Sequence, residues 1–532
     1  MSIKSASDPK EDVAGLTSLE KTVSTSLGIT EDNPLSHLGL EPEVRKDLNL
    51  LGIIATGWNI CNSWVAVAAT MSISIASGGP MTMIYGIVII FLLGGSCALS
   101  MAEIASTYPT AGGQYHWTSI LSPPSLSRGL SYWCGLVNTF GWIASIAGFI
   151  VPFPTITLAL VSFWNPGYVA EAWHTFVIYQ ALNILLTVYN IFGLKKTFWI
   201  MDVGFFMSII AFFVMAITCL VESNPKQSSE SIWTHFENTS GWSSDAVVFL
   251  IGLVNPNFIY SGLDGVIHLS EECSNAATAI PRALASTVLI GFVTSLGFAI
   301  ALCYSYHNFD DVLASAFPAL EIFYQATASA RVATFFTIVL AIISLFAITG
   351  AQQTASRLTW SFARDEALAM SSHLSQVHPR WGVPIYALLF NAVCVAALGC
   401  IYLGSSDAFN SLVSAGLILQ QLSFAFPAAL MLYHRISGTV QEIMPLNKEA
   451  FRLPFGTGAL ANGLTIVLAL ISTIFYNFPA GLPATADAMN YASAVTGALV
   501  LIGIVNWYGY AVKHYNGPRL DSHHSATVDE ST

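Results

Sequence analysis

The chain has 532 residues, of which 54% are hydrophobic and only 9% charged, and its formal net charge at pH 7 is −12. Soluble domains usually carry about 25% charged residues, so this composition excludes a water-soluble globular protein and predicts that lipid covers most of the surface. The acidic balance argues against nucleic acid as a partner. The eight cysteines are scattered without a Cys-X-X-Cys pair, which indicates packing residues rather than a disulfide framework or a metal site.

The chain begins with a polar segment that contains no apolar stretch of signal-peptide length. We interpret residues 1–47 as a disordered cytoplasmic tail, 48–513 as a transmembrane domain and 514–532 as a second cytoplasmic tail. Apolar runs of about 20 residues, the length that crosses roughly 30 Å of hydrocarbon, then follow one another. The predicted spans are 50–76, 81–106, 129–160, 173–192, 197–221, 245–269, 283–305, 330–355, 383–403, 407–433, 457–477 and 490–512. We therefore expect an all-α integral membrane protein of about twelve transmembrane helices.

The basic residues test this arrangement, because cytoplasmic loops of membrane proteins are enriched in Lys and Arg. With a cytoplasmic N-terminus and alternating spans, all of the 19 Lys and Arg residues except Lys226 and Arg331 fall on the cytoplasmic side. The sequon Asn238-Thr239-Ser240 falls on the opposite side, which makes Asn238 a candidate glycosylation site. Both observations support the predicted spans and two cytoplasmic termini.

The first span contains a polar and aromatic cluster, residues 56–66, within sequence that otherwise suits lipid. Asn59, Asn62 and Ser63 can satisfy a loosened backbone or bind a polar ligand. The alternative is that they form hydrogen bonds between helices, as polar residues in membrane helices commonly do.

The sixth span contains the clearest helix interruption. Pro256 removes a helix hydrogen bond, and Gly262 and Gly265 lower helix propensity, so we expect unwinding between Tyr260 and Gly265. A kinked but continuous helix is the alternative. Asp264 lies near the bilayer centre, where a carboxyl costs several kcal/mol unless it faces water, a partner or a substrate. It is either a proton carrier or gate, or a structural hydrogen-bond anchor.

Interruptions in the first and sixth spans are expected when two five-helix halves form an inverted repeat. Several segments then resemble the fungal amino acid and choline permeases, the GABA/choline permease group of the amino acid-polyamine-organocation superfamily. These segments are Ser77-Gly78-Gly79-Pro80, Ser100-Met101-Ala102-Glu103-Ile104, Tyr108-Pro109-Thr110-Ala111-Gly112-Gly113-Gln114-Tyr115-His116-Trp117, Tyr260-Ser261-Gly262-Leu263-Asp264-Gly265, His268-Leu269-Ser270-Glu271-Glu272, Ile280-Pro281-Arg282-Ala283, Ser356-Arg357 and Phe362-Ala363-Arg364-Asp365. The resemblance implies the fold of the bacterial leucine transporter, with two inverted five-helix repeats and two C-terminal helices, and proton-driven uptake.

The resemblance also implies which residues meet the cargo. The substrate-binding candidates are Asn62, Ser63, Trp64, Val65 and Ala66 in the first span and Phe258, Tyr260, Ser261 and Gly262 in the sixth. Phe258 corresponds to an aromatic gate and Asp264 to an acidic proton-coupling or gating position. Trp64-Val65-Ala66 departs from the Gly-X-Gly of many relatives, which argues against a carboxylate cradle of bare backbone.

The cargo predicted is an amino acid or a related amine such as choline or GABA. Aromatic faces near the breaks, at Trp58, Trp64, Phe258 and Tyr260, suit an ammonium group, since such a contact contributes roughly 0.5–2 kcal/mol; simple packing is the alternative for each. Tyr115-His116-Trp117 favours the choline permeases. We expect a secondary active transporter, not an enzyme, with a co-transported proton, no cofactor and no metal, in the plasma membrane or an internal membrane such as the vacuole. A nutrient sensor of the same fold is the alternative, and a channel is a third option.

Overall fold

The structure is a computed structural model that describes residues 48–197, 199–403, 408–444, 450–485 and 489–518. The predicted N-terminal tail 1–47, and residues 519–532 of the predicted C-terminal tail, lie outside the described residues.

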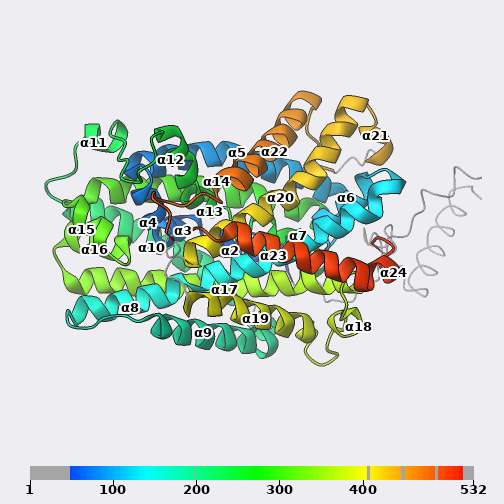
Figure 1. Cartoon of the computed structure of the whole chain (residues 1–532), viewed down its shortest axis with the longest axis horizontal. Coiled ribbons are helices and arrows are strands. Elements are labelled where there is room, and N and C mark those ends of the chain that lie inside the picture. The colour runs from blue at the N-terminus through cyan, green and yellow to red at the C-terminus, as the bar shows by residue number, and fades with distance from the viewer. Residues whose placement is uncertain (1–47, 198, 404–407, 445–449, 486–488, 519–532) are drawn as a thin grey trace, which may run out of the picture. The chain divides into compact units, whose positions relative to one another are not determined.

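The described residues are organised as helices and connecting loops (Figure 1). In the first half of the chain the helices are α2 (Leu50–Cys61), α3 (Ser63–Ala69), α4 (Met71–Ala76), α5 (Gly79–Thr107), α6 (Gln114–Leu121), α7 (Pro124–Ile150), α8 (Pro152–Trp164), α9 (Ala172–Phe192), the 3-10 helix η2 (Leu194–Lys196), α10 (Trp199–Glu222) and α11 (Ser229–Trp233). In the second half they are α12 (Asp245–Gly252), α13 (Val254–Phe258), the 3-10 helix η3 (Leu263–Glu272), α14 (Ala276–Ser305), α15 (Phe309–Ala314), α16 (Pro318–Thr327), α17 (Ala330–Arg364), α18 (Ser371–Leu374), α19 (Ile385–Gly399), the 3-10 helix η4 (Cys400–Leu403), α20 (Ala408–Ser437), α21 (Val440–Ile443), α22 (Phe455–Phe475), α23 (Ala492–Asn506), the π-helix η5 (Trp507–Ala511) and α24 (Val512–His514).

Within the described part of the chain, 11 helical segments are long and apolar enough to cross a membrane. They coincide with eleven of the predicted spans, so the all-α membrane fold is confirmed. The exception is the ninth prediction, 383–403, which contains the shorter apolar helix α19 followed by η4. At 1.5 Å per residue α19 extends about 22 Å, and the 3-10 turn adds about 8 Å. Helix α19 alone is shorter than the hydrocarbon core, but α19 and η4 together reach roughly its thickness.

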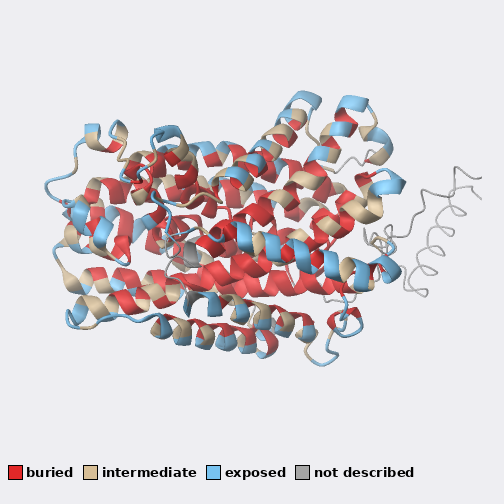
Figure 2. Ribbon diagram, viewed as in Figure 1, coloured by how far each residue is buried: buried red, intermediate tan, exposed pale blue. Residues whose placement is uncertain are grey.

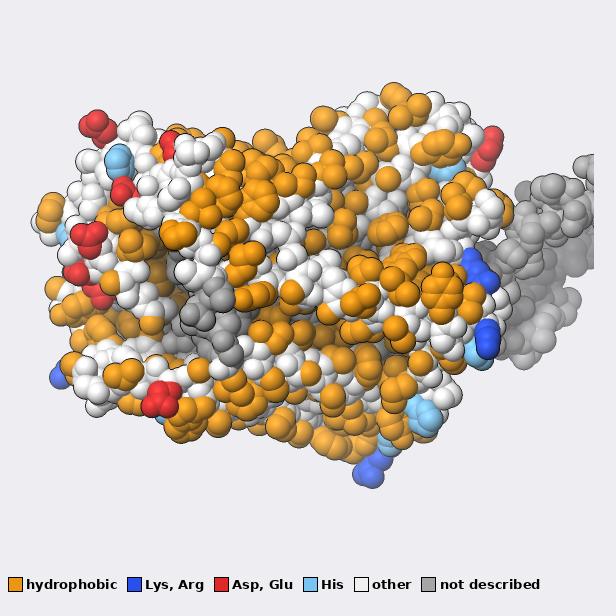
Figure 3. All heavy atoms as spheres, in the orientation of Figure 1, with side chains coloured by type: hydrophobic (Ala, Val, Ile, Leu, Met, Phe, Trp, Pro, Cys, Tyr) orange, Lys and Arg blue, Asp and Glu red, His pale blue; other side chains and the backbone are white. Residues whose placement is uncertain are grey.

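The connections between spans gather at two opposite ends. Figure 1 shows α6, α18, α21 and α24 at one end and α11, α15 and α16 at the other, as alternating crossings require. Figure 3 shows a mainly hydrophobic face between the ends, with most visible Lys and Arg side chains near α18 and α24 and most visible acidic side chains at the opposite end. Spans that cross the membrane in alternating directions predict this separation, with Lys and Arg gathered at the cytoplasmic end.

The first and sixth spans form the centre of the structure. In each of them 78% of the most apolar window is buried, compared with 17% for the last span, and buried ribbon is concentrated in the middle of the helices in Figure 2. The two spans run antiparallel. The Leu48 N–H donates to the Glu272 carbonyl over 3.0 Å at one end, whereas Ser74 Oγ donates to Asn255 Oδ1 over 2.8 Å at the other. This is the arrangement expected of the leading helices of two inverted repeats.

Both central spans are interrupted at the same depth. The first breaks at Asn62, whose φ of 34° and ψ of 59° lie in the left-handed region that asparagine tolerates. The sixth ends its α-helix at Phe258 and turns through Gly262, with φ of 81°, before continuing as the 3-10 helix η3. Ser63 Oγ donates to the Ile259 carbonyl over 2.7 Å and joins the two breaks. The predicted unwinding is therefore present, and a continuous sixth helix is wrong.

The third span was predicted as one helix, but it divides at Val151 into α7 and α8. The division follows from Pro152, which has no N–H for the helix ladder. Val151 keeps helical torsions, with φ of −59° and ψ of −37°, so α8 continues close to the direction of α7.

Candidate functional site

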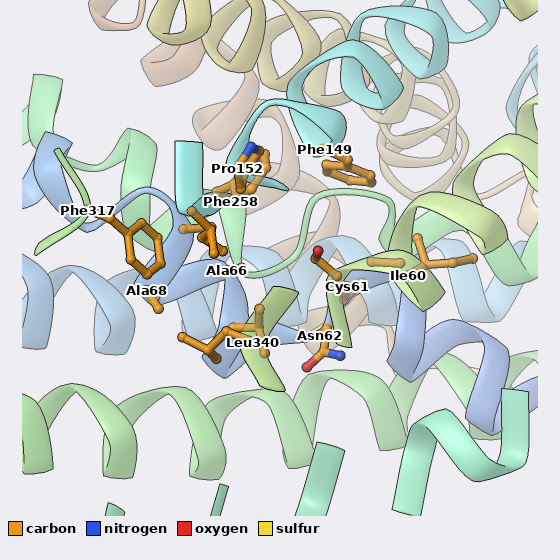
Figure 4. Close-up of a pocket in the computed structure, with 15 residues that line it drawn as sticks. Ile60, Cys61, Asn62, Ala66, Ala68, Phe149, Pro152, Phe258, Phe317 and Leu340 are labelled. Atoms are coloured by element: carbon orange, nitrogen blue, oxygen red, sulfur yellow. The ribbon is translucent and has the colours of Figure 1, made fainter. Parts of the chain in front are cut away.

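A small cavity lies where the two broken spans meet the third and eighth spans (Figure 4). Its lining residues are Ile60, Cys61, Asn62, Val65, Ala66, Ala68, Ala69, Phe149, Pro152, Ile156, Phe258, Phe317, Leu340, Ser344 and Ala347. The lining is apolar except for Asn62, Ser344 and the Cys61 thiol, and it contains no acidic or basic side chain. The volume is about 40 Å³, which accommodates about three or four water molecules at roughly 10–15 Å³ each. A larger cargo can therefore enter only after the lining side chains move apart.

The predicted binding residues divide into two groups. Asn62, Val65, Ala66 and Phe258 line the cavity. The other five belong to the framework around it, because each has a buried partner elsewhere: Ser63 donates to the Ile259 carbonyl, Trp64 to Ser208, Tyr260 to the Val288 carbonyl, and Ser261 Oγ and the Gly262 N–H to Gln420 Oε1. In the first span, Asn59 likewise donates to the Met201 carbonyl over 2.6 Å. For Asn59 and Ser63, bonding between helices is therefore what the structure shows.

The side-chain amide of Asn62 is oriented by a chain of hydrogen bonds. Trp64 Nε1, which only donates, donates to Ser208 Oγ over 2.9 Å. The Ser208 hydroxyl then donates to Asn62 Oδ1, also over 2.9 Å. This bond uses Asn62 Oδ1 as an acceptor and leaves Asn62 Nδ2 buried without a hydrogen-bond partner. Asn62 thus contributes to the lining residue set an amide group whose N–H donors are unused.

Three phenylalanines supply the aromatic part of the lining. Phe149 and Phe258 meet edge to face, with ring centroids 5.4 Å apart, and Phe317 lies beyond them in the segment before α16 (Figure 4). The sequence pointed to Phe258 but not to Phe149 or Phe317, which come from segments far away in the chain.

The other aromatic residues proposed for an ammonium group pack into the protein instead. The Trp64 ring lies edge-on to Phe298, with centroids 4.9 Å apart, and Trp58 contacts Phe205 in the same manner at 6.2 Å. The Tyr260 hydroxyl is 3.0 Å from the Val288 carbonyl. In the structure these three rings therefore take part in packing and hydrogen bonding, and they are not among the residues that line the cavity.

Asp264 does not line the cavity but lies just beyond it, fully buried. Its Oδ2 atom accepts hydrogen bonds from Gln114 Nε2 at 2.9 Å and Trp142 Nε1 at 3.2 Å, and lies 3.1 Å from His268 Nε2. The side chain of Ile60 separates the two places, because it lines the cavity on one side and contacts Gly265 and Gly262 on the other.

Buried ion pairs join η3 to α17 at the end that carries the basic residues. Arg357 Nε lies 2.6 Å from Glu272 Oε1. Arg364 Nη1 donates to Glu271 Oε2 over 3.2 Å, and Arg364 Nη2 donates to Glu271 Oε1 over 3.0 Å. These pairs, with the Leu48–Glu272 backbone bond, close the space below Asp264. The structure is closed at this end.

The Tyr115-His116-Trp117 motif lies at the same end, outside the cavity. Asp365 Oδ2 accepts from the Tyr115 hydroxyl at 2.7 Å and lies 3.1 Å from His116 Nε2. Burial acts to raise the pKa of Asp365, but the hydrogen bond and charge of His116, with help from Arg364, outweigh it and lower the pKa. The residues of this cluster are not among those that line the cavity.

The remaining candidate features lie away from the cavity. Asn238 lies in the loop between α11 and α12, where its Nδ2 donates to the Trp242 carbonyl and to Asp245. Within the described residues, no group of three or more His, Cys, Asp or Glu side chains has the arrangement of a metal site.

Comparisons with known proteins agree with this architecture. The sequence model of the amino acid permease family matches residues 48–501. The choline transporter of Saccharomyces cerevisiae is 32% identical, with 88% of this chain and 82% of the relative covered. The 7-keto 8-aminopelargonic acid transporter of the same yeast is 27% identical (86% and 90%), and a transmembrane transporter of Metarhizium robertsii is 30% identical (89% and 93%). The chain therefore belongs to the amino acid permease family and is a multi-pass membrane transporter rather than an enzyme.

Proposed function

We propose that this transporter carries a small organic amine, with choline as the first cargo to test, and that the cargo binds in the cavity between the two broken helices. The supporting observation is the lining itself: three phenylalanines and one free amide donor, without an acidic or basic side chain. Free amino acids present a carboxylate that usually requires a cationic or multiple-donor partner. A quaternary ammonium needs only aromatic faces and weak negative partial charge.

The end of α2 supplies that partial charge. The helix ends at Cys61, and its last carbonyls point toward the break, where the negative end of the helix dipole favours a cation. In choline, two carbons separate the hydroxyl oxygen from the ammonium nitrogen, and that hydroxyl oxygen would accept a hydrogen bond from Asn62 Nδ2. The choline transporter among the relatives agrees with this assignment. GABA and other amino acids remain the alternative cargo, in which a carboxylate would take the Asn62 donor.

We propose further that uptake is coupled to protons through Asp264, the buried carboxylate beneath the cavity. A carboxylate at this depth is costly unless it is protonated or paired. Opening of the cavity would bring water to Asp264 and reduce that cost, so the protonation state of Asp264 and the opening of the cavity are linked. The relatives are named as transporters, and the sensor alternative gains no support from them.

Uptake of radiolabelled choline into choline-transport-deficient yeast that expresses this chain tests the cargo assignment. We expect saturable uptake that unlabelled choline inhibits more strongly than GABA or a mixed set of amino acids. Stronger inhibition by an amino acid would instead assign the cavity to a carboxylate-bearing cargo.

Phe258→Ala is expected to raise the KM for choline by roughly 2- to 30-fold, which corresponds to the loss of one cation–aromatic contact. Phe258→Tyr retains the aromatic face and should retain most of the affinity. Phe335→Ala, at a ring that is 60% exposed on α17, is the matched control. An unchanged KM in Phe258→Ala would remove this ring from the binding site.

Asn62→Gly is expected to raise the inhibition constant of choline by about 2- to 12-fold, the effect of losing one neutral hydrogen bond. Glycine retains the left-handed backbone at this position without strain. Tetramethylammonium has no oxygen, so its inhibition constant should not change in the same assay. Equal losses for both ligands would show that Asn62 acts on the shape of the site and not as a hydrogen-bond donor.

A further inference from the structure

The buried contact between Asp264 and His268 is more than an anchor for η3. We propose that Asp264 and His268 form a two-residue proton site, and that His268 is the group through which the proton leaves toward the basic, cytoplasmic end. This inference rests on the proposed proton coupling and identifies the second member of its site.

The hydrogen bonds of His268 favour a proton at this contact. Its Nδ1 atom lies 2.8 Å from the Ala111 carbonyl, which can only accept, so Nδ1 carries a hydrogen. Its Nε2 atom lies 3.1 Å from Asp264 Oδ2 and, at a longer 3.4 Å, from Asn138 Nδ2. With no proton between them, a nitrogen lone pair would face a carboxylate. Either His268 is protonated and donates, or Asp264 is protonated and donates to a neutral imidazole.

The rest of the cluster stabilises this one-proton form. Gln114 Oε1 accepts from Asn138 Nδ2 at 2.9 Å, which orients the Gln114 amide so that its Nε2 donates to Asp264. Both Asp264 and His268 have no solvent exposure. With one proton the pair is neutral overall, whereas without it a net negative charge stays buried at a cost of several kcal/mol. Burial thus works against a form of the pair that carries no proton.

No other cation serves Asp264 among the described contacts. The nearby arginines are each paired with another carboxylate, Arg364 with Glu271 and Arg357 with Glu272. The other titratable groups that face Asp264 are the buried thiols of Cys61 on α2 and Cys134 on α7, which carry no positive charge. His268 is thus the positive or proton-accepting partner.

On the side away from Asp264, the contacts of His268 continue through Ala111 to the Glu271–Arg364 ion pair. Ala111 accepts from His268 with its carbonyl and donates its own N–H to Glu271 Oε1 over 3.3 Å. Glu271 is in turn paired with Arg364, whose side chain is 10% exposed. When the Glu271–Arg364 pair opens, the loop that carries Ala111 separates from η3 and His268 meets water first. The proton bound at Asp264 from the cavity side then leaves through His268.

The functional test measures protons and cargo together. Purified protein in proteoliposomes is given radiolabelled choline, and an interior pH dye reports proton entry. We expect a fixed proton-to-choline ratio in the wild type and a ratio near zero in His268→Gln. His434→Gln is the matched control, since His434 is a buried histidine between two neutral partners, the Thr439 hydroxyl and the Leu121 carbonyl. A wild-type ratio in His268→Gln would overturn the inference. A wild type that moves choline without protons would instead contradict the proposed coupling.

A second test needs no cargo. Melting temperatures of purified Asp264→Asn, His268→Gln and the double variant form a thermodynamic cycle. His268→Gln leaves a carboxylate without its proton-sharing partner, whereas the double variant is as neutral as the protonated pair. We therefore expect the double variant to melt at a higher temperature than His268→Gln. If the effects of the two single changes simply add, the pair does not share a proton and the inference is wrong.

Discussion

Asp264→Asn is expected to abolish accumulation of the cargo, so that the internal concentration never exceeds the external one. Asparagine retains the size of the side chain and can accept from Gln114 and Trp142 as the carboxylate does, but it cannot bind and release a proton. The variant should still reach the cell surface, because a neutral amide at this buried position costs less than an unpaired charge. The measurement is the steady-state ratio of internal to external radiolabelled cargo, normalised to surface expression.

Asp202→Asn provides the control for Asp264→Asn. Asp202 lies in the first turn of α10 and is only partly buried, so it reports on the general effect of removing a carboxylate from a spanning helix. It should accumulate cargo as the wild type does. Accumulation that remains proton-dependent in Asp264→Asn would remove Asp264 from the coupling mechanism.

Arg357→Gln is expected to reduce the amount of folded protein sharply. The change leaves the Glu272 carboxylate, which is 1% exposed, without the partner that lies 2.6 Å from it. Removing one member of a buried ion pair typically costs about 3–5 kcal/mol, a large part of the 5–15 kcal/mol that usually stabilises a folded domain. Size-exclusion chromatography in detergent and the thermal midpoint measure the loss.

The double variant Arg357→Gln/Glu272→Gln should recover much of this loss, because no unpaired charge then remains. Arg380→Gln, at an exposed arginine that contacts the Trp381 ring, is the control and should melt close to the wild type. If Arg357→Gln is as stable as Arg380→Gln, the Arg357–Glu272 pair does not hold η3 against α17.

The spans were predictable because each one needs a long apolar run, and lipid imposes that requirement locally. The break in the sixth span was also predictable, since Pro256 and Gly262 act on their own backbone. Helix α19 was the one predicted span that proved too short, because the apolar run continues through a 3-10 turn that periodicity does not distinguish from an α-helix.

The composition of the site was harder to predict. Phe317 and Phe149 reach the cavity from segments more than a hundred residues apart, and nothing in their neighbours marks them as lining residues. Trp64 and Asn62 lie two residues apart and both contact Ser208, yet Trp64 packs against Phe298 while Asn62 lines the cavity. Which side of a broken helix faces the cavity depends on tertiary packing, and aromatic residues serve core and site equally well.

The partner of Asp264 illustrates the same limit. The cost of a buried carboxylate predicted that some partner exists, but the sequence did not single out His268 or Gln114. His268 lies four residues further along η3, and Gln114 begins helix α6, 150 positions away. The local sequence thus predicts that Asp264 has a partner, whereas only the folded structure identifies which residues those partners are.

The most direct test of the central claim is accumulation of radiolabelled choline in transport-deficient yeast expressing this chain, with and without a protonophore, alongside cells that carry the empty vector. Proton-coupled carriage predicts saturable accumulation above the external concentration and its collapse to equilibrium when the protonophore is added. Uptake that reaches only the external concentration, or accumulation that the protonophore does not change, would contradict proton-coupled transport by this protein.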